Sequence, residues 1–156
     1  MQRDKNLYPL SHQHHNGLMA VLLLKKGLQK NADTGVMRDF ILAAWNDELN
    51  GHFIAEEEHL KPSLLQLPQL QQLYDQMMQE HQQIRLVIDA LEKKNSQIEL
   101  IASFRDLLEK HIRFEERELF PFIEQHATVE ALHEAGKKLS HLPNGNCSYF
   151  PVKFWE

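Results

Sequence analysis

His52-Phe-Ile-Ala-Glu-Glu-Glu-His-Leu-Lys-Pro62 is followed, 59 residues further along, by His111-Ile-Arg-Phe-Glu-Glu-Arg-Glu-Leu-Phe-Pro121. Both segments have the form His-x-x-x-Glu-Glu-x-x-Leu-x-Pro. Side chains four residues apart share one face of an α-helix, so each segment presents an imidazole and a carboxylate to the same side. The repeat therefore indicates two related helices that carry matching polar groups.

These polar groups lie in helical stripes of large apolar residues. In chain order the stripes are His15, Leu18 and Leu22; Trp45, Leu49, His52, Glu56 and His59; Tyr74, Met77, His81, Ile84 and Ile88; and Phe104, Leu108, His111, Glu115, Leu119 and Phe122. An apolar stripe faces the core of a helical protein. We therefore expect four histidines and two glutamates to meet inside the protein.

The helices themselves follow from periodicity and from terminal signals. We predict four long helices over about residues 11–30, 35–60, 68–94 and 96–125, and a short fifth helix over 128–142. Ser11 and Thr128 are expected as N-caps, and Ser96-Gln-Ile-Glu99 as a capping box. The short connections favour an all-α fold, an antiparallel up-down-up-down four-helix bundle with a short C-terminal helix and tail.

Length and composition set outer limits on function. The 156 residues predict one domain over residues 1–142, and 42% hydrophobic residues suffice for its core. The net charge is 17 − 22 = −5, and no Lys/Arg run is present, so we expect no nucleic-acid partner. The single Cys147 and the short apolar run at residues 18–24 predict a cytoplasmic protein without a membrane partner.

The last residues, 143–156, form a predicted tail that is rich in aromatic side chains. Tyr149, Phe150, Phe154 and Trp155 lie within it. Two interpretations remain open: the aromatic side chains cover the apolar end of their own bundle, or they contact a second copy of the chain in a homodimer.

A cluster of buried histidines and glutamates needs a reason. A single buried histidine is commonly an ordinary core residue with a hydrogen-bond partner, but several packed together with carboxylates are costly to bury. Imidazole nitrogen and carboxylate oxygen are natural ligands of transition metals, and a bound cation removes that cost. The pattern therefore predicts a metal site in the core.

The ligand from the first helix is the least determined, because three of the five residues 11–15 are histidines. His81 in the second half is followed by an isoleucine three residues later. His15 is followed by a leucine in the same relation, whereas His14 is followed by a glycine. This parallel favours His15 over His14, with His12 as a weaker candidate.

The order His…His-x-x-x-Glu…His…His-x-x-x-Glu on four helices resembles the hemerythrin family, in its HHE cation-binding branch. The resemblance covers about residues 7–125, and the opening Leu10-Ser-His-Gln-His-His-Asn-Gly-Leu18 is similar to the start of short bacterial members. It implies two non-haem iron ions, with an oxo or hydroxo bridge as a further expectation. The implied ligands are His15, His52, Glu56, His81, His111 and Glu115, with the two glutamates bridging the ions.

Two departures from the oxygen-carrying members shape the functional expectation. Those proteins carry a further histidine where this chain has Arg85, and they space the last helix His-x-x-x-x-Asp rather than His-x-x-x-Glu. The chain is therefore more similar to relatives linked to iron sensing, nitric-oxide response and iron–sulfur repair. We expect a protein that binds O2, NO or peroxide for sensing, storage or an iron or oxidative-stress response.

Three other functions compete with this one. The same di-iron site could serve an enzyme that reduces peroxide or NO or donates iron for Fe–S repair, but no catalytic acid or base independent of the ligands is evident. A ferritin-like carboxylate enzyme would use Glu56-x-x-His59 and Glu130-x-x-His133. A metal-free helical interaction module would fold without any cation.

Overall fold

The structure is a computed structural model that describes residues 2–93, 96–143 and 150–156. The helices are α1 Tyr8–Gln29, α2 Thr34–Ala44, η1 Trp45–Leu49, α3 Asn50–His59, η2 Pro68–Leu70, α4 Gln71–Glu92, α5 Ile98–Phe114, η3 Glu115–Leu119, α6 Phe120–His126 and α7 Val129–Leu139. Cys147 and Tyr149, named above, lie outside the described part, as does Asn95, the connection between the third and fourth predicted helices.

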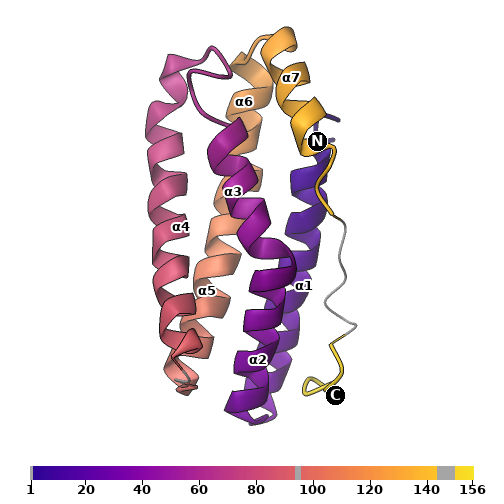
Figure 1. The fold of residues 1–156 in the computed structure, drawn as a ribbon, viewed down its shortest axis with the longest axis vertical. Helices are drawn as coiled ribbons and strands as arrows, with labels where there is room; N and C mark the ends of the chain where they lie inside the picture. Colours follow the sequence, from indigo (N-terminus) through magenta and orange to yellow (C-terminus); the bar gives the residue numbers. More distant parts are fainter. Residues whose placement is uncertain (1, 94–95, 144–149) are drawn as a thin grey trace.

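Four long helical rods lie side by side along the molecule (Figure 1). The first rod is α1 and the third is α4. The second is α2 continued through η1 into α3, and the fourth is α5 continued through η3 into α6, with η1 and η3 as single π-helical segments. This confirms the all-α helical fold, and no strand occurs in the described ranges. None of the helices described is both long and apolar enough to cross a membrane.

The ends of the helices agree only partly with the expected caps. Thr128 caps α7 as predicted, since its side chain accepts a hydrogen bond from Ala131 N at 3.1 Å. The N-cap of α5 is Gln97 rather than Ser96, so the predicted capping box is wrong. Ser11 is also not an N-cap, because α1 begins three residues earlier with a proline in its first turn, a position that needs no amide hydrogen.

Two apolar cores fill the bundle, one toward each end. One core is built from residues such as Leu24, Phe40, Ile88 and Phe104, and the other from residues such as Leu10, Leu65, Met77 and Phe120. Along every rod the polar residues of the cluster fall where one core gives way to the other. The fold therefore places a polar layer between two apolar ones.

The aromatic end of the tail covers the first of these cores. Phe154 is buried, its ring centroid lies 5.0 Å from that of Phe40, and Trp155 packs on both rings. Gly27 makes room for it, because a Cβ at that position would lie 2.6 Å from a Phe154 ring carbon. The tail thus covers the apolar end of its own bundle, where Figure 1 places the C-terminus beside the ends of α1 and α2. A homodimer contact stays a prediction.

Candidate metal centre

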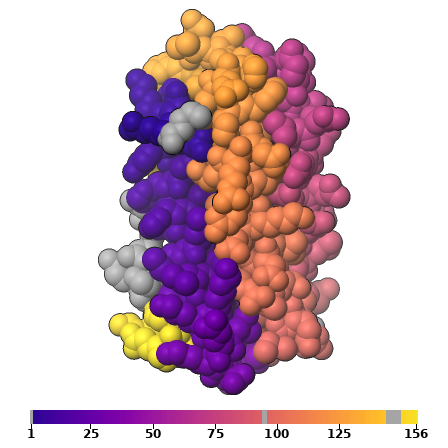
Figure 2. All heavy atoms as spheres, turned by 180° about the vertical axis from the view of Figure 1, so that it is seen from behind, coloured from indigo at the N-terminus to yellow at the C-terminus, as the bar shows by residue number. Residues whose placement is uncertain are grey.

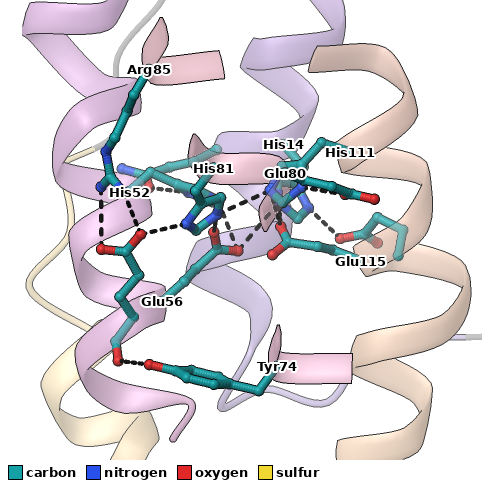
Figure 3. A network of polar contacts seen from close by, with 12 residues as sticks. His14, His52, Glu56, Tyr74, Glu80, His81, Arg85, His111 and Glu115 are labelled. Carbon is teal, nitrogen blue, oxygen red and sulfur yellow. Dashed lines mark hydrogen bonds and ion pairs between the residues drawn. The ribbon is translucent and has the colours of Figure 1, made fainter. Parts of the chain in front are cut away.

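Six buried polar residues from all four rods point toward one another in the polar layer (Figure 3). They are His14 from α1, His52 and Glu56 from α3, His81 from α4, and His111 and Glu115 from α5 and the start of η3. None is more than 3% exposed. The cluster is therefore shut off from bulk water on every side, and its polar atoms depend on one another.

The six residues divide into two overlapping sets that could each hold a cation. One set is His14, His52, Glu56 and Glu115, and the other is His81, His111, Glu56 and Glu115. Within each set one ligand atom per residue lies within 4.8 Å of the others. Both glutamates belong to both sets, so the arrangement offers two cation positions joined by two carboxylates.

Each histidine turns its Nε2 atom inward and its Nδ1 atom outward to a hydrogen-bond acceptor. The outward pairs are His14 Nδ1 with Glu116 at 2.7 Å, His52 Nδ1 with Gln13 at 2.8 Å, His81 Nδ1 with Glu57 at 2.7 Å, and His111 Nδ1 with Glu80 at 2.8 Å. Carboxylate and amide oxygens only accept, so every Nδ1 donates. A ligand histidine is usually held in this way, with its other nitrogen free for a metal.

Three inward atoms lack a hydrogen-bond partner. They are His52 Nε2, Glu56 Oε2 and Glu115 Oε2. His52 Nε2 and Glu56 Oε2 are only 3.1 Å apart, yet their orientation does not make a hydrogen bond. Buried polar atoms without partners are costly. Since all three are natural metal ligands facing one interior, the residues fit a pair of bound cations.

Without a cation the cluster holds its charges as ion pairs. Burial alone would lower the pKa of His111, but Glu115 and Glu80 raise it to about 10. Burial likewise opposes protonation of His14, yet the hydrogen bonds that it donates to Glu115 and Glu116 raise its pKa well above the usual range. Burial would raise the pKa of Glu56, and the surrounding histidines lower it well below its usual value. Without a cation, the neighbouring carboxylates therefore favour the protonated forms of His14 and His111.

Two of the outer carboxylates are themselves fixed by arginines. Arg85 donates to Glu57 at 2.6 Å and 3.2 Å, and Arg3 donates to Glu116 at 3.1 Å. The site is thereby bounded by a second layer of ion pairs. An arginine carries no free lone pair, so Arg85, at the position of the further histidine in oxygen carriers, orients a ligand rather than binding metal itself.

The aromatic rings beside these arginines cover the histidines. Phe53 stacks on His81 with ring centroids 3.9 Å apart, and Arg85 lies over the Phe53 ring at 5.7 Å. In the other half Phe120 stacks on His14 at 5.3 Å, and Arg3 lies over the Phe120 ring at 5.4 Å. Each of these histidines is thus fixed by a hydrogen bond at its edge and a ring against its face.

The first-helix member of the cluster is His14, and the structure does not bring the predicted His15 into it. His15 is exposed, and it belongs to neither set. The expected stripe also fails at Leu22, which is 45% exposed. His12 likewise lies outside both sets. The other five predicted residues, His52, Glu56, His81, His111 and Glu115, are brought together.

Gly17 accounts for this difference from the expectation. The glycine three residues after His14 seemed to lack a core contact, but it is buried where α1 packs against α5. A Cβ at Gly17 would lie 2.8 Å from Ile112 Cδ1. Figure 2 shows α1 and the rod of α5 and α6 meeting along the back of the molecule. The inward stripe of α1 therefore contains a glycine where the matching stripe of α4 contains Ile84.

Other residues weighed from the sequence lie outside the cluster. His59 is half-buried, lies 3.9 Å from Glu58 and lines a small surface pocket between α3 and α7. Glu58 and Glu118 are exposed. Glu130 and His133 are exposed as well, so the ferritin-like pairing does not form in this part of the chain.

Sequence reasoning missed three residues that support the site. Gln13 and Glu80 each directly precede a clustered histidine, and each holds the histidine of a different helix. Arg3 reaches the cluster from outside any predicted helix. A signal existed for the first two, since the polar residue before each first histidine recurs in both halves. Arg3 left no signal in the sequence.

Residues 6–123 match the family model described as Hemerythrin HHE cation binding domain. The match spans all six clustered residues and most of the four rods. Searches among curated proteins and among solved structures gave no match.

Proposed function

Since the chain belongs to the hemerythrin HHE cation-binding family, we propose that it holds two non-haem iron ions in the buried cluster and uses them to bind O2 or a related small ligand. His14 and His52 would hold one ion, and His81 and His111 the other. Glu56 and Glu115 would bridge the two. When bound, the iron pair supplies open coordination positions and exchangeable electrons for a diatomic molecule or peroxide.

One observation carries this proposal above the others. The two donor sets share both carboxylates, while all four histidines keep Nδ1 satisfied from outside and Nε2 directed inward. A metal-free interaction module would not need four imidazoles and two carboxylates facing one interior with three of their atoms lacking partners. Bound cations would remove the free-energy cost of burying these polar atoms without partners.

The set of protein donors also favours the binding of a small molecule. Each ion would receive two imidazoles and shared carboxylates, and Arg85 offers no further ligand because it pairs with Glu57. Positions therefore remain for an exogenous ligand. The apolar cores on either side of the layer limit access to small, uncharged molecules.

We also propose that the four rods run antiparallel in an up-down-up-down order. We further propose that the protein is cytoplasmic. The short connections between rods favour that course. Sensing, storage and an iron or oxidative-stress response are all compatible with such a site, with O2, NO or peroxide as the partner molecule. Binding of the small molecule should be reversible in a binding protein, whereas an enzyme should consume it.

The test is metal analysis of protein purified without a polyhistidine tag, loaded anaerobically with Fe(II). About two irons per chain, with new visible absorption on exposure to O2, would support the proposal. Absorption that disappears under vacuum would identify a binder, and sustained consumption of peroxide or NO would identify an enzyme. Less than one iron per chain after loading would refute the site.

A further inference from the structure

We propose that the two cation positions are unequal, and that the position made by His81 and His111 fills first and more tightly because Glu80 stands where the other position has Gln13. This inference rests on the proposed di-iron site and adds an order of loading. It concerns the residues behind the ligands rather than the ligands themselves, which are the same at both positions.

The two halves of the chain supply these outer residues in matching places. Gln13 precedes His14 on α1 and accepts from His52 on α3, at 2.8 Å. Glu80 precedes His81 on α4 and accepts from His111 on α5, at 2.8 Å. Position, partner atom and distance therefore agree, and the difference that remains is a neutral amide against a carboxylate.

The remaining outer groups nearly balance between the two positions. His14 donates to Glu116, which pairs with Arg3, and His81 donates to Glu57, which pairs with Arg85. Arg3 is also shared with Glu124, but that carboxylate touches no histidine of the cluster, whereas Glu80 accepts directly from His111. Behind Glu80 lie the neutral Gln76, which donates to it at 3.0 Å, and the charge of Lys110. Lys110 makes no ion pair within 4 Å of Glu80 among the described residues, so it offsets the carboxylate only in part.

The orientation of the neutral Gln13 side-chain amide is fixed by two hydrogen bonds. Gln13 is 2% exposed, and its Nε2 donates to the carbonyl oxygen of Pro143 at 2.6 Å, which leaves Oε1 to face His52. A carboxylate behind an imidazole raises the electron density at Nε2 and adds a negative charge near the cation, whereas an amide does neither to the same degree. The anionic position should therefore attract a divalent cation more strongly.

The experiment titrates metal-free protein with Zn(II), a diamagnetic divalent cation that shifts mainly the imidazoles it binds, and follows both heat and the ring resonances of 15N-labelled histidine. Single His→Gln variants identify each resonance. We expect two binding steps whose affinities differ by about 10–100-fold, the usual effect of a partner behind a ligand. The resonances of His81 and His111 should shift with the first equivalent, and those of His14 and His52 with the second.

The deciding variant is Glu80→Gln, which makes the two positions alike. It should weaken the first step about 10–100-fold and bring the four histidines to shift together. Asp75→Asn is the matched control, because it removes the same charge from an exposed site on the same helix and should leave both steps unchanged. Thermal unfolding of metal-free Glu80→Gln checks that the variant folds.

Each outcome separates this inference from the proposed function. Two Zn(II) ions that bind with equal affinity, or His14 and His52 shifting first, would overturn the inference and leave the paired site standing. A Glu80→Gln variant that still loads His81 and His111 first would also overturn it. Failure to bind two Zn(II) ions at all would count against the paired site itself.

Discussion

The two halves of the molecule carry the same motif, yet its final proline acts differently in each. In the first half the helix ends at His59, before Pro62, and the chain turns away through Gln66 at φ 54°. In the second half Pro121 lies inside a continuous rod. The π-helical segment η3 precedes the proline, and the α-helix α6 begins directly after η3 at Phe120. Pro121 therefore lies in the first turn of α6, where no amide hydrogen is needed.

Both halves nevertheless expose the carbonyl of the second motif glutamate to an outside donor. The residue before a proline is disfavoured in helical conformation, so the first helix stops and Glu57 O accepts from the Tyr74 hydroxyl at 2.7 Å. In the second half the residue five beyond Glu116 is Pro121, which has no amide hydrogen, and Glu116 O accepts from Arg3 at 2.8 Å. The comparison teaches that the motif fixes a carbonyl and a carboxylate in space, while the donor and the path of the chain differ.

The largest expected effect lies where the halves are joined. Glu56→Ala and Glu115→Ala each remove a ligand that both cation positions share, so each should abolish tight binding of both ions. The loss should exceed the roughly 10–100-fold caused by losing a residue behind a ligand. Elemental analysis after iron loading measures it. If either variant kept one tightly held ion, the carboxylates would not be shared.

The next effect separates the halves. His14→Ala removes a ligand of one position only, so it should lower the stoichiometry of iron from about two per chain to about one. His15→Ala serves as the matched control and should leave two, because that side chain is exposed. Metal analysis of both variants in parallel provides the test. Equal stoichiometry in the two would contradict the placement of His14.

A packing difference between the halves gives a third test. Gly17→Leu should lower the free energy of unfolding by about 1–3 kcal/mol, because the new side chain must displace α1 from α5. Gly51→Leu is the control. No atom lies within 4 Å of a Cβ there, so the substitution should stabilise the helix by roughly 0.5 kcal/mol. Chemical denaturation of both metal-free variants measures the difference, and destabilisation of equal size would refute the close approach.

The pH dependence of the metal-free protein should reveal the ion pairs of both halves. The pKa of His111 is raised to about 10, so its stabilising contribution is complete below the unfolded value of 6.5 and is lost as the pH rises toward 10. The pKa of Glu116 is lowered to about 2, so its contribution is complete above 4.5 and is lost as the pH falls toward 2. Denaturation midpoints across this range should therefore fall at both ends.

The matched control for the alkaline limb is His111→Gln. A neutral amide cannot lose a proton there, so the decline in stability between pH 6.5 and 10 should become shallower. An unchanged alkaline decline in this variant would show that His111 is not protonated in the metal-free fold.

The smallest expected effect tests the carbonyl contacts. Tyr74→Phe removes the hydroxyl that donates to Glu57 O and should cost about 1 kcal/mol of stability, the usual value of such a hydrogen bond. Tyr8→Phe is a suitable control, because Tyr8 is 58% exposed. Equal stability of the two variants would remove the role given to Tyr74.

Much of the site was predictable because a helix converts spacing into direction. His52 with Glu56 and His111 with Glu115 needed only the four-residue interval and their apolar neighbours, and His81 needed only its stripe. The all-helical fold followed from the same periodicity. The second glutamates of the two motifs, Glu57 and Glu116, each hold a histidine by a hydrogen bond and join neither set.

What the sequence alone determined is thus the inward positions of His52, Glu56, His81, His111 and Glu115 on the second, third and fourth rods, since these depend on spacing along one helix. Only the tertiary structure decided between His14 and His15, because the choice rests on how closely another helix approaches a glycine. It also decided the partners of Gln13, Glu80 and Arg3, which lie far away along the chain. Contacts between distant segments depend on how rods are placed against each other, and no spacing along one helix encodes that.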